Sequence, residues 1–198
     1  MNKVLIIGSG FSSHQVSDYD YKLNGWEIVV INNGWMACPD IFDYHIYPND
    51  YIRDREKICK YLPHQKHFVY TQDDLSPYGG QTACGKSATL NISYAVLRRL
   101  NPRMIGYLGC DMNYTPTEDG STSIYGIGFD VKTHKIPDPD KMVNLFGKND
   151  PDYLRTIYTR FSTISQQHNC EVYNFSSDTK TRLPYQQVHP KDIDYESQ

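Results

Sequence analysis

The chain opens with a short apolar, β-branched run that ends abruptly in a glycine loop. Residues 3–7 read KVLII, and Gly8, Ser9 and Gly10 follow directly. An apolar run of this length without polar alternation is typical of a strand buried on both faces, as in a parallel sheet. A glycine loop directly after such a strand lets the backbone approach a ligand closely, where a helix would begin. The sequence therefore predicts a buried first strand with a ligand site at its end.

Further apolar runs along the chain also end in polar or turn-forming residues. They cover residues 26–31, 44–47, 67–71, 104–108 and 171–175, and helical patterns lie between them at 51–61, 88–100 and 152–168. Strands that alternate with helices form parallel sheets, because parallel neighbours need crossover connections. We therefore expect an α/β fold: a single Rossmann-like domain over residues 1–182, with a mostly parallel sheet, helices on both faces, and a polar C-terminal tail at 183–198.

Composition limits the class of protein and its partners. The net charge of −3 is spread along the chain, which disfavours a general DNA- or RNA-binding protein. No apolar run approaches the roughly 20 residues of a membrane span, and the N-terminal run is too short for a signal peptide. The five cysteines are scattered without a CxxC pair, which fits reduced thiols. We expect a cytoplasmic protein without a membrane span, and the sequence leaves assembly into a homo-oligomer open.

The carboxyl ends of the expected strands carry the candidate site residues. In a parallel α/β sheet these ends share one edge, and ligands bind in the crevice there. Asn32 and Asn33 follow the second strand, and Asp111 follows the strand at 104–108. Residues 112–150 have no clear period and suggest a lid-like insertion over this edge. Within it, Tyr114 and Tyr125 could donate to a departing phosphate, and His134, like Asp111, is a candidate base.

A second phosphate-binding pattern competes with the first. Residues 80–87 read GQTACGKS, which matches GxxxxGK[ST], the phosphate loop of many ATPases and kinases. That loop should leave a buried strand directly, whereas several turn-forming residues separate Gly80 from the strand expected at 67–71. Gly85, Lys86 and Ser87 would still lie at a helix N-terminus, where backbone N–H groups and a lysine can hold phosphate. His64 and His67 form HxxH without a third ligand nearby, so we expect no metal site.

Several segments in order resemble the bacterial sialyltransferases that decorate lipooligosaccharide, and related archaeal pterin-pyrophosphokinase-like proteins. Those families have a strand with a G-N-G-P-S loop, a strand ending in Asn-Gln, a strand followed by Asn-Pro, a Ser-Gly helix start, and a strand ending in Gly-Ile-Asp before two tyrosines. The counterparts here read GSGFSS, VVINN, IYPND, ACGKSATLNISYAVL and YLGCDMNY. Ser9 stands in place of the asparagine. No histidine lies near residues 146–148, where the catalytic histidine of the family is expected.

The resemblance implies a metal-independent glycosyltransferase that uses a nucleotide-sugar donor, with no other cofactor, and a glycan or other hydroxyl acceptor. The donor would be CMP-linked. By that likeness the nucleotide is held by Gly8, Ser9, Gly10, Asn32, Asn33 and Ser87, and Tyr114 and Tyr125 assist the leaving phosphate. Two alternatives stay open: a phosphate-loop kinase or NTPase that uses residues 80–87, and a non-catalytic nucleotide-binding or structural module, which the absent histidine favours.

Overall fold

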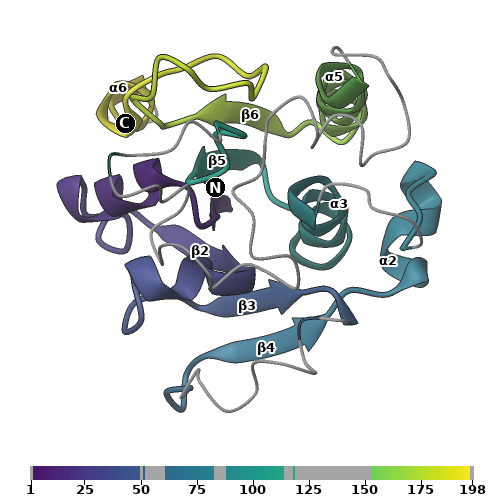
Figure 1. Ribbon diagram of the computed structural model, residues 1–198, viewed down its shortest axis with the longest axis horizontal. Helices are drawn as coiled ribbons and strands as arrows, with labels where there is room; N and C mark the ends of the chain where they lie inside the picture. Colours follow the sequence, from purple (N-terminus) through teal and green to yellow (C-terminus); the bar gives the residue numbers. More distant parts are fainter. Residues whose placement is uncertain are drawn as a thin grey trace.

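The computed structural model describes residues 2–49, 51, 61–82, 88–113, 118 and 153–196. Its centre is a six-stranded sheet in which every pair of neighbours is parallel, in the order β4-β3-β2-β1-β5-β6 (Figure 1). The α/β fold and parallel sheet expected from the sequence are thus confirmed. The strands are β1 (Lys3–Ile7), β2 (Trp26–Ile31), β3 (Tyr44–Tyr47), β4 (Lys66–Val69), β5 (Met104–Leu108) and β6 (Glu171–Asn174).

Helices cover both faces of this sheet. Alternate side chains of β1 show the two faces: Val4 and Ile6 belong to one apolar cluster, and Leu5 and Ile7 to the other. The helices whose side chains fill the first cluster are α3 (Ala88–Leu100) and α5 (Tyr153–Gln167). The second is covered by the 3-10 helix η1 (Phe11–Asp18) and by α6 (Pro190–Glu196), and the 3-10 helix η2 (Asn32–Ala37) follows β2. A strand buried on both faces needs this double cover, which explains its unbroken apolar sequence.

Two differences from the sequence expectation concern the connections. The first crossover is a 3-10 helix with three serines among its eight residues, and serine side chains bond nearby backbone and lower α-helix propensity. Between β4 and α3 lie two short helical turns, α2 (Gln72–Leu75) and η3 (Ser76–Tyr78). Most of the helix expected at 51–61 and of the lid expected at 112–150 falls outside the described residues. None of the described helices has the length and apolar character that a membrane span needs.

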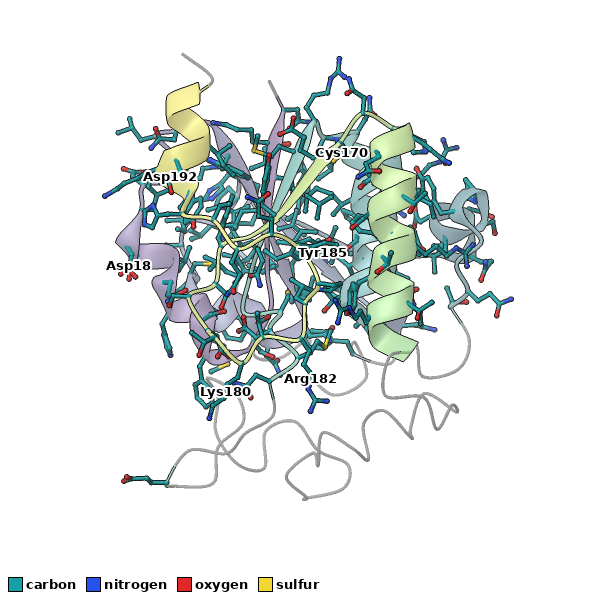
Figure 2. All side chains as sticks on the ribbon, turned by 90° about the horizontal axis from the view of Figure 1, so that it is seen from above. Asp18, Cys170, Lys180, Arg182, Tyr185 and Asp192 are labelled. Carbon is teal, nitrogen blue, oxygen red and sulfur yellow. The ribbon has the colours of Figure 1, made fainter. Side chains whose placement is uncertain are left out.

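The polar C-terminal segment adds to the core. Leu183 and Tyr185 are buried, and the Tyr185 ring stacks on Tyr107 of β5 with 5.2 Å between the ring centroids. Figure 2 shows Tyr185 at the centre of the molecule and Cys170, which precedes β6, at one end. A few apolar residues are enough to dock a segment of polar composition when they meet an aromatic surface.

The strand order defines where a ligand can bind. From β1 the chain adds β2, β3 and β4 on one side, and then crosses over to form β5 and β6 on the other. The direction of winding therefore reverses between β1 and β5. In open parallel sheets the crevice outside the carboxyl ends of the strands at such a reversal is the usual ligand site. Here that place lies between the loop after Ile7 and the loop after Leu108.

Candidate functional site

The loops that follow β1 and β5 are joined by their backbones. The Gly8 N–H donates to the carbonyl oxygen of Leu108, and the Gly10 N–H donates to that of Gly109, each over 2.8 Å. Gly109 has a φ of +64°, and a Cβ on it would lie 2.6 Å from the Gly8 carbonyl oxygen, so only glycine fits there. The N–H groups of Gly8 and Gly10 are therefore already used within the protein and are not available to a ligand.

Ser12 and Asp111 form the polar centre of this edge. The Ser12 hydroxyl accepts a hydrogen bond from the Gly109 N–H over 2.7 Å and donates to Asp111 Oδ2 over 2.5 Å. Ser12 therefore orients a carboxylate rather than offering its hydroxyl to a ligand. The other carboxylate oxygen, Asp111 Oδ1, is buried and accepts no hydrogen bond from the residues that the structure describes. Unpaired buried carboxylate oxygens are rare and call for a functional explanation.

The environment of Asp111 favours its protonated form. Asp111 is only 4% exposed, and this burial raises the pKa of its carboxyl group. The hydroxyls of Ser12 and Ser176 offset part of the rise, and the negative charge of Asp178 adds to it. A carboxylate with a raised pKa binds a proton more readily, which is the property a general base needs.

The loop after β2 lies against the same edge. A Cβ on Gly34 would collide with the carbonyl oxygen of Ile7 and lie 2.9 Å from that of Gly8. Asn32 begins this loop in the left-handed region, with a φ of +48°, and its buried side-chain oxygen has no hydrogen-bond partner among the described residues. Asn33 is buried, and its side-chain oxygen accepts a hydrogen bond from the Tyr51 hydroxyl over 3.0 Å. The structure thus brings the loop of Asn32 and Asn33 beside the glycine loop.

His45 of β3 is hydrogen-bonded to the backbone of Asn32, a contact that the sequence did not predict. Its Nε2 lies 2.7 Å from the Asn32 carbonyl oxygen, and its Nδ1 lies 2.9 Å from the Tyr61 hydroxyl. Because a carbonyl oxygen only accepts, Nε2 carries the proton and Nδ1 accepts from Tyr61. Burial lowers the pKa of His45 from 6.5 to about 4, so the ring is neutral. The only feature of the sequence that pointed to this contact was a histidine, His45, within the apolar run at 44–47.

The GxxxxGK[ST] segment does not leave a strand in the way that a phosphate loop does. Between the end of β4 at Val69 and Gly80 lie α2 and η3, and the Gly80 N–H donates to the Leu75 carbonyl oxygen over 3.0 Å. Gln72 Nε2 donates to the carbonyl oxygen of Gly80 over 2.9 Å. Gly80 therefore closes a helical segment beside the edge strand.

Six of the candidate residues lie outside the described part of the chain. They are Gly85, Lys86, Ser87, Tyr114, Tyr125 and His134. Within the described part, Gly8, Ser9, Gly10, Asn32, Asn33 and Asp111 occupy the ends of three adjacent strands. The described residues also contain no group of three His, Cys, Asp or Glu side chains that could hold a metal ion.

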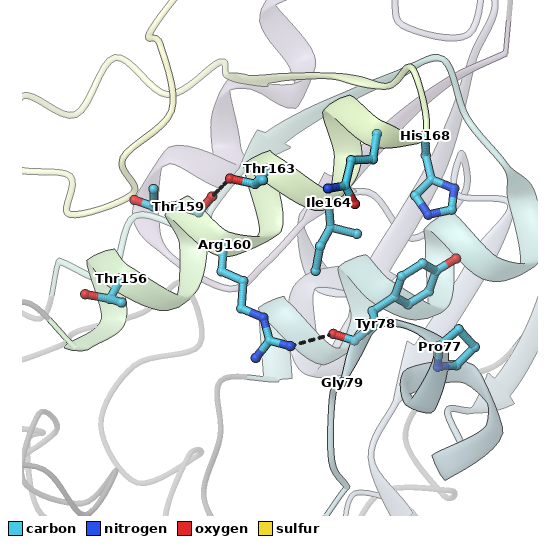
Figure 3. Close-up of a pocket in the computed structure, with 10 residues that line it drawn as sticks. Pro77, Tyr78, Gly79, Thr156, Thr159, Arg160, Thr163, Ile164 and His168 are labelled. Atoms are coloured by element: carbon cyan, nitrogen blue, oxygen red, sulfur yellow. Dashed lines mark hydrogen bonds between the residues drawn. The ribbon is translucent and has the colours of Figure 1, made fainter.

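A hollow of about 700 Å³ lies between η3 and α5 (Figure 3). Arg160 lines this hollow, and its guanidinium donates to the Tyr78 carbonyl oxygen over 3.0 Å. The hydroxyls of Thr159 and Thr163 donate to carbonyl oxygens of their own helix. Arg160, Thr159 and Thr163 thus bond within the protein, and the candidate site remains the edge formed by β1, β2 and β5.

Comparison with protein-family models, with curated proteins and with solved structures finds no match for this chain. The function assigned to the site therefore depends on its own geometry and chemistry.

Proposed function

We propose that this protein is a glycosyltransferase that takes a sugar from a nucleotide-sugar donor bound between the ends of β1 and β5. The observation that carries the proposal is Asp111. Its carboxylate is held by Ser12 at the point where the sheet reverses direction, is largely buried, and has one oxygen to which no described residue donates. A hydroxyl brought by a substrate would satisfy that oxygen and be deprotonated by it.

In this reaction Asp111 accepts the proton of the acceptor hydroxyl. The acceptor oxygen forms a bond to the anomeric carbon of the sugar, and the bond from that carbon to the donor phosphate breaks, leaving its electron pair on the phosphate oxygen. Tyr114 and Tyr125 are predicted to donate hydrogen bonds to that phosphate, and His134 is the second candidate for the base. By the sequence resemblance, a metal ion is not required, and the acceptor is a glycan or another hydroxyl compound.

The test is turnover of CMP-, UDP- and GDP-linked sugars by the full chain, after a thermal-shift screen has shown which nucleotide stabilises it. Asp111→Asn should lower turnover by about 10²- to 10⁴-fold, the usual contribution of a positioned general base. Donor affinity should not fall, because the variant removes a negative charge beside the donor phosphate. Asp192→Asn, an exposed carboxylate on α6, is the matched control. Full activity of Asp111→Asn together with loss of activity in His134→Ala would move the role of base to His134.

The main alternative is a phosphate-loop kinase or NTPase that uses residues 80–87. The helical turns between β4 and Gly80 favour the glycosyltransferase, because a phosphate loop connects a strand directly to a helix. Lys86→Ala separates the two: ATP hydrolysis or ATP binding that disappears in this variant would support the alternative. A wild-type protein that no nucleotide or nucleotide sugar stabilises would favour a non-catalytic module.

A further inference from the structure

The segment that follows β6, residues 176–187, passes directly beside the candidate base. The Arg182 N–H donates to the backbone carbonyl oxygen of Asp111 over 2.8 Å, and the Thr181 hydroxyl lies 3.3 Å from the same oxygen. This segment, which we name the C-terminal loop, therefore borders the site although its sequence shows no binding motif.

The C-terminal loop is fixed from two sides. On one side, Gln15 of η1 exchanges two hydrogen bonds with Ser177, one of them from the Ser177 N–H to Gln15 Oε1 over 3.1 Å. On the other side, Asn113 Nδ2, just after β5, donates to Asp178 Oδ2 over 2.7 Å. Within the loop, Gln187 Nε2 donates to the Asp178 carbonyl oxygen over 3.0 Å. A loop tied in this way holds its backbone in a defined position, so that binding has to order only the side chains that extend from it.

Two cations extend from this loop. Lys180 and Arg182 are both exposed, and Figure 2 shows them at the same end of the molecule, opposite Cys170. Since β6 begins just after Cys170, that end is the carboxyl edge of the sheet. Among the described residues, neither side chain has a carboxylate within ion-pair distance. Within the described part of the chain, two positive charges without an ion-pair partner thus lie at the edge where the ligand would bind, although the Asp178 carboxylate accepts from the Lys180 backbone N–H.

A phosphate at this edge needs such charges, because the glycine loop cannot neutralise it. The N–H groups of Gly8 and Gly10 are used by Leu108 and Gly109, and the Ser12 hydroxyl is used by Asp111. The buried carboxyl group of Asp111, when ionised, would repel a phosphate brought beside it. Arg and Lys side chains form the strongest hydrogen bonds to phosphate oxygens.

We propose that Lys180 and Arg182 form an anion site that binds the phosphate groups of the donor nucleotide. The inference rests on the proposed function for the identity of the ligand, but the site itself requires only a phosphate or pyrophosphate group. The nucleoside would lie toward the loop of Asn32 and Asn33, and the phosphates toward the C-terminal loop.

The experiment measures binding of inorganic pyrophosphate, CMP and cytidine to the full chain by calorimetry. Arg182→Gln should weaken pyrophosphate and CMP by about 10-fold, the loss expected for one charge-assisted hydrogen bond, and leave cytidine unchanged. Lys180→Gln should act in the same direction, and the double variant should also flatten the salt dependence of CMP binding. Arg182→Lys should retain part of the affinity. Arg103→Gln, an exposed arginine before β5 at the opposite edge, is the control.

Three results would overturn the anion site: no binding of pyrophosphate or CMP by the wild type, wild-type affinity in the double variant, or an equal loss in Arg103→Gln. A loss of affinity in Lys86→Ala but not in Arg182→Gln would count against it as well. The two proposals fail separately. Pyrophosphate binding that depends on Arg182, in a protein that turns over no nucleotide sugar, supports the anion site and contradicts the glycosyltransferase.

Discussion

Asp111 is a buried carboxylic acid just after the end of β5. Burial raises its pKa in the folded protein, so the unfolded chain releases the proton first as the pH rises. Stability is therefore lost as the pH rises through the folded pKa of this group. A residue that costs stability at neutral pH and is nevertheless supported by Ser12 fits a functional role better than a structural one.

The same reasoning predicts that Asp111→Asn stabilises the protein. The amide oxygen can still accept from Ser12, and the buried charge is removed, so we expect the free energy of unfolding near neutral pH to rise by about 1 kcal/mol. In a chain of this size that is about 2–4 °C in the melting temperature. Thermal unfolding of both proteins at pH 5 and pH 8 measures the effect. A gain no larger at pH 8 than at pH 5 would contradict a raised pKa.

His45 makes the opposite contribution to the pH dependence. Its pKa is lowered from 6.5 to about 4, so the unfolded chain binds the proton more tightly. Its stabilisation is complete above pH 6.5 and is lost as the pH falls toward 4, by about 1.4 kcal/mol for each pH unit. Urea unfolding across this range should show the loss, and His45→Asn should reduce its slope while lowering stability at neutral pH. Exposed His64→Asn should keep the wild-type slope.

The loops after β1 and β2 contact each other through backbone, and Gly34 makes this possible. Gly34→Ala places a methyl group against the carbonyl oxygens of Ile7 and Gly8, which cannot move without disturbing β1. We expect a loss of about 1–3 kcal/mol in the free energy of unfolding, together with weaker nucleotide binding.

Gly25→Ala is the matched control for this element. Gly25 lies at the other end of the same strand, directly before β2, at φ +75°, and a Cβ there meets open space. The variant should lose about 1 kcal/mol through backbone strain alone and bind nucleotides as the wild type does. Denaturant unfolding and calorimetry on both variants give the comparison. Equal binding by Gly34→Ala and the wild type would show that the loop of Asn32 lies away from the ligand.

For the molecule as a whole, the C-terminal residues tie the site to the core. Tyr185 stacks on Tyr107, and its hydroxyl lies 3.4 Å from the carbonyl oxygen of Tyr158 on α5. One side chain thus joins the C-terminal loop, the sheet and a covering helix. The position of Arg182 beside Asp111 depends on this docking.

Tyr185→Ala should therefore reduce both stability and anion binding. Truncation of a buried aromatic side chain costs about 3 to 5 kcal/mol, and the loss should appear in urea unfolding. Pyrophosphate affinity should fall as well, because the C-terminal loop loses its anchor. Leu23→Ala, at a side chain that is 82% exposed, should change neither quantity. Unaltered pyrophosphate affinity in a folded Tyr185→Ala protein would show that Gln15 and Asn113 hold the loop unaided.

The sequence alone determined the parallel sheet and the edge where a ligand would bind. Unbroken apolar runs such as residues 3–7 and 104–108 indicate strands that are buried on both faces. The glycines and polar residues after these runs indicate where each strand ends. These are local properties, because a strand and its turn are encoded within a few neighbouring residues.

Only the tertiary structure decided which groups at that edge are available to a ligand. Ser12 and Asp111 are 99 residues apart, and their hydrogen bond requires β1 and β5 to be neighbours in register. The same adjacency uses the N–H groups of Gly8 and Gly10, and docking of Tyr185 brings Arg182 to Asp111. Such contacts depend on strand order and packing of the whole core, which no local pattern specifies.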